Sequence, residues 1–460
     1  MNYREEKDSL GIKKIPADVY YGIQVARAIE NFPISGLRID KVFIETYAKI
    51  KKAAALVNNQ SGNLDSIKTE AIIKAAEEVI EGKFDEQIKI DVYQAGAGTS
   101  FNMNLNEIIA NRALEILGHS KGSYAIVHPN DDVNMSQSTN DTFPSAMRIA
   151  VLEYHKNLLR ELYALEQVLR HKSKQFRSVI KSGRTHLQDA MPITLGQEFG
   201  AYADSIANQI HCLQKASHSL HYLSIGGTAI GTGINTPPLF SRKMVKILSS
   251  LTNSTFKKAP NLIEKTQSMT DFVQYSAVLK VFCLELIKIA NDLRLMSSGP
   301  RTGLAEIELP AVQPGSSIMP GKVNPVICEA LTMICFQILG NDLTISMAAQ
   351  AGQLELNVMM PVIIHNLLFS IRILANGIHM LSNKCIKGIT ANELKCSWYF
   401  ENSIALVTLI TPTIGYLKAA ELAKEAVATG KTFYALIEEK GLLSQKELKQ
   451  LKDIKKITGS

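Results

Sequence analysis

Cysteine, tryptophan and long uncharged apolar segments are scarce in this sequence of 460 residues. The six cysteines form no Cys-x-x-Cys pair, which excludes the usual zinc and dithiol motifs and indicates reduced, mostly structural thiols. No run of about 18 uncharged apolar residues is present, so we expect no membrane partner. The first residues, MNYREEKDSLG, lack the apolar core of a signal peptide, and we therefore expect a cytoplasmic protein.

The motifs of several large enzyme classes are also missing. The sequence has no P-loop, no Gly-x-Gly-x-x-Gly after a strand, no His-Glu-x-x-His and no Gly-x-Ser-x-Gly. Cysteine and histidine spacings typical of zinc sites are absent as well. These absences argue against phosphate-loop, dinucleotide, zinc-hydrolase and serine-hydrolase chemistry.

The charge balance is mildly basic, with 50 Lys and Arg against 43 Asp and Glu and a net charge of +7. The densest basic stretch alternates with apolar and acidic residues, which predicts a solvated helix face. It contains Lys446, Lys449, Lys452, Lys455 and Lys456. We therefore expect no nucleic-acid partner, whereas a small anionic substrate agrees with the charge.

Helical spacing dominates the sequence from about residue 142 to 385, and strand patterns are rare. The clearest apolar stripe runs from Val151 to Leu169 in steps of three and four residues. A second helix is expected at 271–297, and others from Leu195, after Pro325 and at 356–383. These patterns predict a mainly α fold with a central bundle of long helices.

The segment 277–290 is apolar almost all round, and the mean hydropathy of the chain is +0.03. A helix that is apolar on every face is buried on every face. Two explanations remain open at this point. Either the bundle continues across subunits, or one thick core within the chain covers the helix.

Four clusters of small polar residues lie at 98–104, 136–141, 183–189 and 315–325. Their hydroxyls, amides and few cations donate hydrogen bonds to carboxylates. Helix capping is the commoner explanation for the second cluster, and a lone His186 or Lys322 has ordinary structural roles. The fourth cluster differs, because its Gly and Pro residues predict a mobile loop and its serines have no simple packing explanation.

The run GSSIMPGKVNP at 315–325 resembles the signature of the aspartase/fumarase superfamily. The other clusters match this family's active-site segments in the same order, and the resemblance extends from PADVYYG at 16–22 to the C-terminal region. It implies a mainly α, three-domain lyase with regions 1–137, 138–392 and 393–460. It also implies a homotetramer with a shared helical core, in which three subunits contribute to each active site.

The resemblance implies a small dicarboxylate substrate and fumarate as product. The segments 98–100 (GTS) and 138–140 (STN) favour elimination of ammonia from L-aspartate. His186, Glu329 and the run 128–134 instead resemble class II fumarases, and Met360 replaces an acid usual in aspartases. Dehydration of L-malate is therefore the alternative, and a non-catalytic structural protein is a more distant one.

The resemblance also assigns roles to individual residues. Ser316 is the expected base that removes a proton from carbon, and His186 is the second expected catalytic residue. Substrate binding is expected from Thr99, Ser138, Thr139, Asn140, Thr185, Ser317, Lys322 and Asn324. Ser100 and Glu329 are expected to support these residues without contacting the substrate themselves. No organic cofactor and no resident metal are implied, while activation by a divalent cation is left open.

Overall fold

The computed structural model describes residues 2–451 and 453–459. Its contacts divide the chain into two compact units that do not follow chain order. Unit 1 comprises Met1–Leu158, Cys212–Val281 and Gln337–Ile373, and unit 2 comprises Leu159–His211, Phe282–Phe336 and Leu374–Ser460. Each unit combines segments that are far apart in the sequence, so this division does not test the three consecutive regions expected from the sequence. Those regions stay a prediction.

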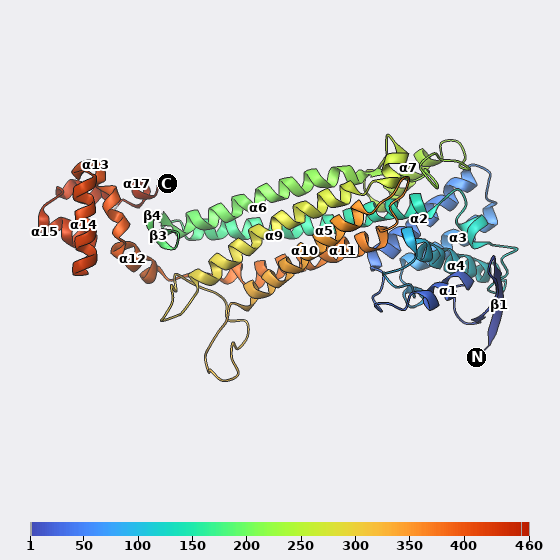
Figure 1. Cartoon of the computed structure of the whole chain (residues 1–460), viewed down its shortest axis with the longest axis horizontal. Helices are drawn as coiled ribbons and strands as arrows, with labels where there is room; N and C mark the ends of the chain where they lie inside the picture. Colours follow the sequence, from blue (N-terminus) through green and yellow to red (C-terminus); the bar gives the residue numbers. More distant parts are fainter. Residues whose placement is uncertain (1, 452, 460) are drawn as a thin grey trace. The chain divides into compact units, whose positions relative to one another are not determined.

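Long helices dominate the fold, as predicted, and each has residues in both units (Figure 1). They are α5 (Thr139–Gln175), α6 (Leu195–Ser217), α9 (Thr270–Met296), α10 (Val326–Gln350) and α11 (Met360–Lys384). Within unit 1, Ser276 of α9 donates to Asp342 of α10 at 2.8 Å. Within unit 2, Tyr202 of α6 donates to Asp292 of α9 at 2.8 Å. The expected mainly α architecture with a helical bundle is therefore confirmed.

Unit 1 also contains shorter elements. They are β1 (Tyr3–Asp8), β2 (Gly11–Pro16), α1 (Ile23–Asn31), α2 (Lys41–Gln60), α3 (Ser66–Ile80), α4 (Thr99–Ile116), β5 (Tyr222–Leu223), α7 (Phe240–Thr252), β6 (Lys257–Lys258) and α8 (Leu262–Gln267). A π-helical turn at Pro129–Val133 precedes α5. Helices α2 and α3 begin where Asp40 and Asp65 accept backbone N–H groups, which is the usual capping role of aspartate.

Unit 2 contains the remaining short elements. They are β3 (Ile180–Thr185), β4 (Gln188–Thr194), β7 (Ile307–Glu308), β8 (Thr390–Ala391), α12 (Glu393–Asn402), α13 (Thr411–Ile414), α14 (Tyr416–Thr429), α15 (Phe433–Lys440), α16 (Gln445–Leu451) and α17 (Ile454–Thr458). The C-terminal helices share a small apolar core that includes Leu406, Leu436 and Ile437. Among the described lysines of the basic stretch, those at 446, 449, 455 and 456 are exposed, and Lys452 lies outside the described residues.

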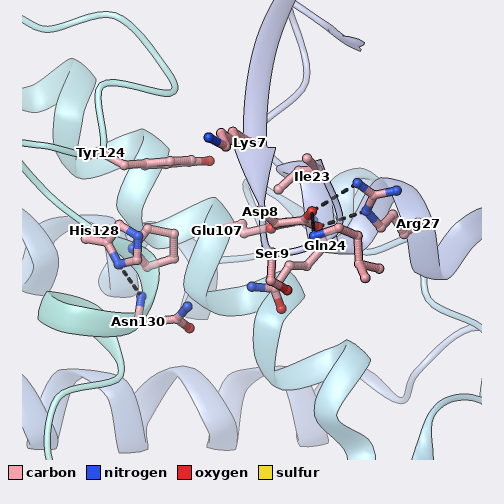
Figure 2. Close-up of a pocket in the computed structure, with 12 residues that line it drawn as sticks. Lys7, Asp8, Ser9, Ile23, Gln24, Arg27, Glu107, Tyr124, His128 and Asn130 are labelled. Atoms are coloured by element: carbon pink, nitrogen blue, oxygen red, sulfur yellow. Dashed lines mark hydrogen bonds and ion pairs between the residues drawn. The ribbon is translucent and has the colours of Figure 1, made fainter. Parts of the chain in front are cut away.

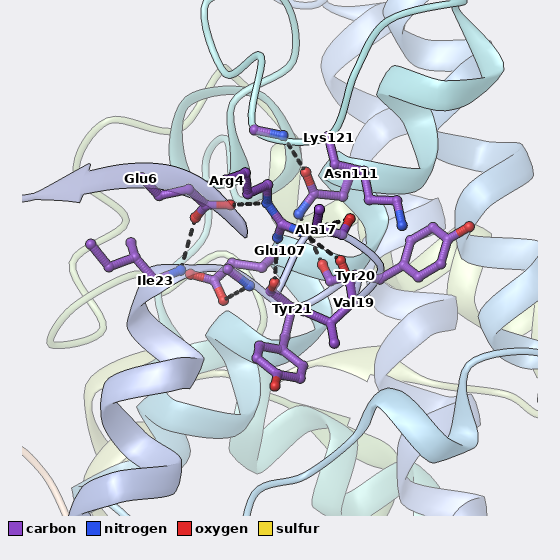
Figure 3. A network of polar contacts seen from close by, with 12 residues as sticks. Arg4, Glu6, Ala17, Val19, Tyr20, Tyr21, Ile23, Glu107, Asn111 and Lys121 are labelled. Atoms are coloured by element: carbon purple, nitrogen blue, oxygen red, sulfur yellow. Dashed lines mark hydrogen bonds and ion pairs between the residues drawn. The ribbon is translucent and has the colours of Figure 1, made fainter. Parts of the chain in front are cut away.

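Strands are short and paired in twos throughout the part of the chain that the structure describes. In the first pair, Arg4 of β1 donates to Glu6 of the same strand and to the backbone oxygen of Tyr21 (Figure 3). Glu6 in turn accepts the N–H of Ile23, and Glu107 accepts the N–H of Gly22 at 2.6 Å. These carboxylates satisfy the free N–H groups at the start of α1, where the helix dipole favours negative charge.

Two helical segments, Val326–Gln350 and Met360–Gly388, are long and apolar enough to cross a membrane by length and composition. Core helices of soluble proteins can be equally long and apolar, so length and composition do not decide between a membrane-spanning helix and a core helix. Helix α10 nevertheless leaves large apolar side chains uncovered in the single chain, among them Met333, Phe336 and Leu343. On α9, Val281 and Leu284 are about half exposed, although the sequence predicts burial all round the segment 277–290.

A buried charge cluster joins α5, α8 and α9 in unit 1. Asp271 accepts from the fully buried Arg148 and from Lys265, each at 2.7 Å. Burial alone would raise the pKa of Asp271, but the two cations outweigh it and hold this pKa below its ordinary value. The cluster therefore depends on one carboxylate to balance two buried cations.

We predict that Asp271→Asn destabilises the fold strongly, because it leaves Arg148 and Lys265 without a counter-charge. Breaking a buried ion pair costs about 3–5 kcal/mol, and thermal unfolding should show a clearly lower apparent midpoint. Glu439→Gln is a suitable control, since Glu439 pairs with Lys431 at the surface and its loss should change the midpoint little. Equal midpoints for Asp271→Asn and the control would contradict this role.

Candidate active site

The predicted site residues fall into two groups, one in each compact unit. Unit 1 contains Thr99, Ser100 and the segment 138–140. Unit 2 contains Thr185, His186, the loop 315–325 and Glu329. Each group has its own local geometry.

The first cluster begins α4 with a backbone turn that depends on glycine. Gly98 has φ of +83°, and a Cβ on it would lie 2.0 Å from the ring of Phe143. The turn leaves Thr99 exposed at the first residue of the helix, while Ser100 is buried. Since helix N-termini present free N–H groups, this position suits contact with an anion.

The second cluster begins α5 and serves as its cap. The Ser138 hydroxyl accepts the N–H of Asn140 at 3.1 Å, and Asp141 accepts the N–H of Ser138 at 3.0 Å. The capping explanation is thus correct, but these residues do more. The hydroxyl of Thr139 accepts a hydrogen bond from Asn102 of α4 at 3.0 Å. That bond joins the first two clusters at the starts of α4 and α5.

Asp141 also holds the glycine-rich loop 226–233 against the start of α5. One of its oxygens accepts the N–H groups of Gly226 and Thr228, each at 2.9 Å. Asn140 adds a bond from its side chain to the backbone oxygen of Ala229 at 2.8 Å. Burial raises the pKa of Asp141 to about 6, while the backbone N–H groups oppose that rise. The sequence shows this loop only as an interruption of the helical pattern, so its place beside the second cluster was missed.

Lys51 lies near the first two clusters and was not among the residues predicted from the sequence. Its side chain is buried and donates to Asn102, Asn134 and Gln137 at 2.7, 2.8 and 3.1 Å. Burial lowers the pKa of Lys51 to about 7, and the charge of Asp141 opposes that shift. The only signal in the sequence is the position of this lysine on the apolar stripe of α2, four residues after Tyr47.

In unit 2, Thr185 and His186 lie at the tip of the β3–β4 hairpin. Thr185 pairs with Gln188, so the turn consists of His186 and Leu187, both with φ near +60°. Positive φ at two bulky residues is strained, and such strain concentrates at functional sites. Both Thr185 and His186 are exposed, and the pairing of His186 with Glu329 stays a prediction.

The base of this hairpin is held by buried charges. Glu306 forms an ion pair with Lys181 at 2.9 Å and accepts a hydrogen bond from Arg184 at 2.8 Å. Arg184 also lies over the ring of Tyr399, at 5.0 Å from its centre. The exposed tip therefore projects from a base that is fixed in place.

The loop 315–325 is closed on itself by two hydrogen bonds. Gly315 donates its N–H to the backbone oxygen of Lys322 at 2.7 Å, and the side chain of Asn324 donates to the backbone oxygen of Gly315 at 2.7 Å. A Cβ on Gly315 would lie 2.6 Å from the Lys322 oxygen, so this closure requires glycine. Ser317 and Lys322 project into solvent from the closed loop.

Ser316 has the most distinctive environment in that loop. Its hydroxyl oxygen accepts the backbone N–H groups of Ile318 and Met319 at 3.3 and 3.0 Å. Two N–H donors on one oxygen favour its deprotonated form. These two N–H groups would stabilise negative charge on the Ser316 oxygen.

A polar pocket near the N-terminus is separate from the predicted residues. It has a volume of about 460 Å³ and lies between the β1–β2 turn, α1 and the π-helical turn (Figure 2). Arg27 pairs with Asp8 on one side, and His128 accepts the N–H of Asn130 on the other. Among the described residues, no group of three or more His, Cys, Asp and Glu side chains is arranged to hold a metal ion.

Comparison with known proteins gives matches along almost the whole chain. Residues 11–340 match the family model described as Lyase, and residues 406–459 match Fumarase C C-terminus. The aspartate ammonia-lyase of Bacillus subtilis is 50% identical over 97% of this chain and 94% of that protein. The aspartate ammonia-lyase of Helicobacter pylori strain 26695 is also 50% identical, over 97% of this chain and 96% of that protein.

Solved structures agree with these matches. A fumarate lyase:delta crystallin from Brucella melitensis, bound to cobalt, superposes with a TM-score of 0.96 at 46% identity, covering 99% of this chain and 100% of that one. A class II fumarase from Schistosoma mansoni superposes with a TM-score of 0.95 at 37% identity, with 99% of each chain covered.

We predict that Asp141→Asn loosens the loop 226–233. The amide group keeps one acceptor oxygen but places N–H hydrogens where the other oxygen accepted a bond, so a buried backbone N–H loses its partner. The cost of about 1–3 kcal/mol should speed amide hydrogen exchange at Gly226 and Thr228 by about tenfold or more. Glu86→Gln, at an exposed position, is the control. Unchanged exchange in Asp141→Asn would show that the loop is held by other contacts.

Proposed function

This chain belongs to the lyase family, and we propose that it acts as an aspartate ammonia-lyase, which eliminates ammonia from L-aspartate to give fumarate. One observation carries the proposal: identity of about 50% to curated aspartate ammonia-lyases over nearly the full chain. The four polar clusters of the sequence support it, because they supply donors for two carboxylates and for a leaving amine.

The difficult step is removal of a proton from the carbon beside the β-carboxylate. The resulting carbanion is stabilised as a dianionic aci-carboxylate, so donors must surround that group. Thr99, Ser138, Thr139 and Ser317 are the proposed donors. Thr99 and Thr139 each stand at the first turn of a helix, α4 and α5, where the dipole also favours negative charge.

Ser316 is the proposed base for this proton. A free serine hydroxyl is a poor base in water, but the N–H groups of Ile318 and Met319 stabilise its alkoxide form. The loop is exposed in the single chain, and its closure over substrate would exclude water from Ser316.

The remaining residues complete the proposed binding site. Lys322 and Asn324 bind the α-carboxylate, whereas Asn140, Thr185 and His186 contact the departing amino group. Ammonia leaves anti to the removed proton. We propose that no organic cofactor or resident metal takes part, since carboxylates are held by hydroxyl, amide and ammonium donors.

We also propose that the chain forms a cytoplasmic homotetramer with sites shared between subunits. Uncovered apolar residues on α9 and α10, such as Leu284, Met333 and Phe336, support this assembly. Helix packing between copies would bury them and account for the apolar character of α10 without a membrane. Shared sites would bring together residue groups that belong to different compact units of one chain.

Two features favour a second candidate, the dehydration of L-malate by a class II fumarase. His186 and Glu329 resemble fumarase residues, and the Schistosoma mansoni enzyme superposes closely. We predict that the purified protein releases fumarate from L-aspartate, measured by its ultraviolet absorbance, and does so faster than from L-malate. Turnover of L-malate alone would replace the proposal with the fumarase reaction. Turnover of neither substrate would favour a structural role.

We predict that Ser316→Ala lowers kcat by about 10²–10⁴-fold, because it removes the proposed base. The tetramer should remain intact, since Ser316 makes its hydrogen bonds within its own loop. Steady-state kinetics with L-aspartate and size-exclusion chromatography measure the two properties.

Lys322→Ala provides the contrast within the same loop. Loss of a charged hydrogen bond to the α-carboxylate should raise KM by about 10- to 100-fold, with a smaller effect on kcat. Near-normal kcat in Ser316→Ala would remove that serine from the role of base, and an unchanged KM in Lys322→Ala would remove that lysine from substrate binding.

A further inference from the structure

Lys51 is a buried cation in contact with neutral amide groups. Its ammonium group has three N–H donors, and three side-chain oxygens accept them: Oδ1 of Asn102, Oδ1 of Asn134 and Oε1 of Gln137. The charge of Asp141 attracts Lys51 and raises its pKa, but the two side chains form no direct hydrogen bond. Burying such a charge is costly, and an apolar side chain would fill the space at lower cost. The position therefore calls for an explanation beyond packing.

Two of the three oxygens face Lys51 for reasons independent of it. The Asn134 amide nitrogen donates to the backbone oxygen of Gln137 at 3.2 Å. The Gln137 amide nitrogen donates to the backbone oxygens of Val133 and Met135, each at 3.1 Å. Their oxygens must then point the other way, toward Lys51, so the cage around the ammonium group is built from acceptors.

The third partner, Asn102, is oriented by Lys51 itself. An ammonium group only donates, so Asn102 must turn its oxygen toward Lys51 and its nitrogen away. That nitrogen donates to the hydroxyl oxygen of Thr139 at 3.0 Å. Within residues 2–451 and 453–459, the Thr139 hydroxyl makes this one hydrogen bond as acceptor, so its own hydrogen can donate to another group.

We propose that Lys51 is a positioning residue that, through Asn102, sets Thr139 as a hydrogen-bond donor to the substrate's carboxylate. The inference rests on the proposed function, in which Thr139 binds the carboxylate that becomes dianionic. A donor aimed at that group gains strength as its charge grows, so the effect falls on the chemical step more than on substrate binding. The direction of one buried hydrogen-bond chain thereby contributes to catalysis.

The sharpest test reverses the direction of the hydrogen bond between residue 102 and Thr139 and leaves the positive charge of Lys51 in place. Asn102→Asp keeps the shape of the side chain and gives Lys51 a carboxylate partner, which favours folding. A carboxylate cannot donate to Thr139, so Thr139 would donate inward to Asp and lose its outward hydrogen bond. We predict that kcat for L-aspartate falls by about 10- to 100-fold, with a smaller change in KM. Wild-type kcat in Asn102→Asp would overturn the proposal.

A double-mutant cycle separates this role from a structural one. Thr139→Val removes the hydroxyl while keeping the side-chain shape, and Lys51→Met removes the cation. If Lys51 acts through Thr139, Lys51→Met lowers kcat by about 10- to 100-fold in the wild type but has little further effect in Thr139→Val. Equal effects in both backgrounds would overturn the proposal. If Lys51→Met does not fold, Asn102→Asp replaces it in the same cycle.

Lys52→Met is the matched control, because Lys52 is the adjacent lysine on α2 and pairs with Glu77 at the surface. Its kcat should equal that of the wild type. The wild-type protein itself separates the two proposals: failure to turn over L-aspartate counts against the proposed function, and the cycle is then run with L-malate, which carries the same carboxylates. Turnover by the wild type with unchanged kcat in both Asn102→Asp and Lys51→Met counts against the role of Lys51 alone.

Discussion

The part of the candidate site that lies in unit 1 depends on the hydrogen bonds that the Asp141 carboxylate accepts. A single buried side chain caps α5 through Ser138 and holds the loop 226–233 through Gly226 and Thr228. Removing the bond to Gly226 or to Thr228 would leave a buried N–H group without a partner. The start of α5, and with it Ser138 and Thr139, is therefore placed by one acid that makes no proposed contact with substrate.

The buried charges near this part of the candidate site therefore act indirectly. Asp141 and Lys51 are both buried, and each reaches the proposed substrate residues through a neutral hydroxyl, amide or backbone group. Neutral donors at the surface of a site can stabilise a dianion without holding product as tightly as exposed cations would. Buried charges orient those donors, and because the surrounding protein is already fixed, little reorganisation accompanies the reaction.

Much of the fold could be predicted from local patterns. The stripe from Val151 to Leu169 and the helix expected at 271–297 locate α5 and α9, because helical spacing is a property of neighbouring residues. Ser138 could be identified as a cap for the same reason. Lys51 could not, since its partners lie about 50 to 90 residues away in the sequence and only tertiary packing brings them together. The docking of the loop 226–233 likewise depends on contacts with a residue far away in the sequence, Asp141.

The packing of Phe143 against Gly98 shows how distant contacts restrict the substitutions that a position can accept. With the Phe143 ring 2.0 Å from where a Cβ would stand and φ at +83°, residue 98 accepts no side chain while Phe143 is present. Phe143 must therefore be replaced by a smaller residue before residue 98 can carry a side chain. A library that randomises only the polar cluster 98–104 would therefore sample a narrow set of folded proteins. Altering this part of the proposed site is therefore a problem of paired substitutions, in which Phe143, an apolar residue outside the polar cluster, has to change first.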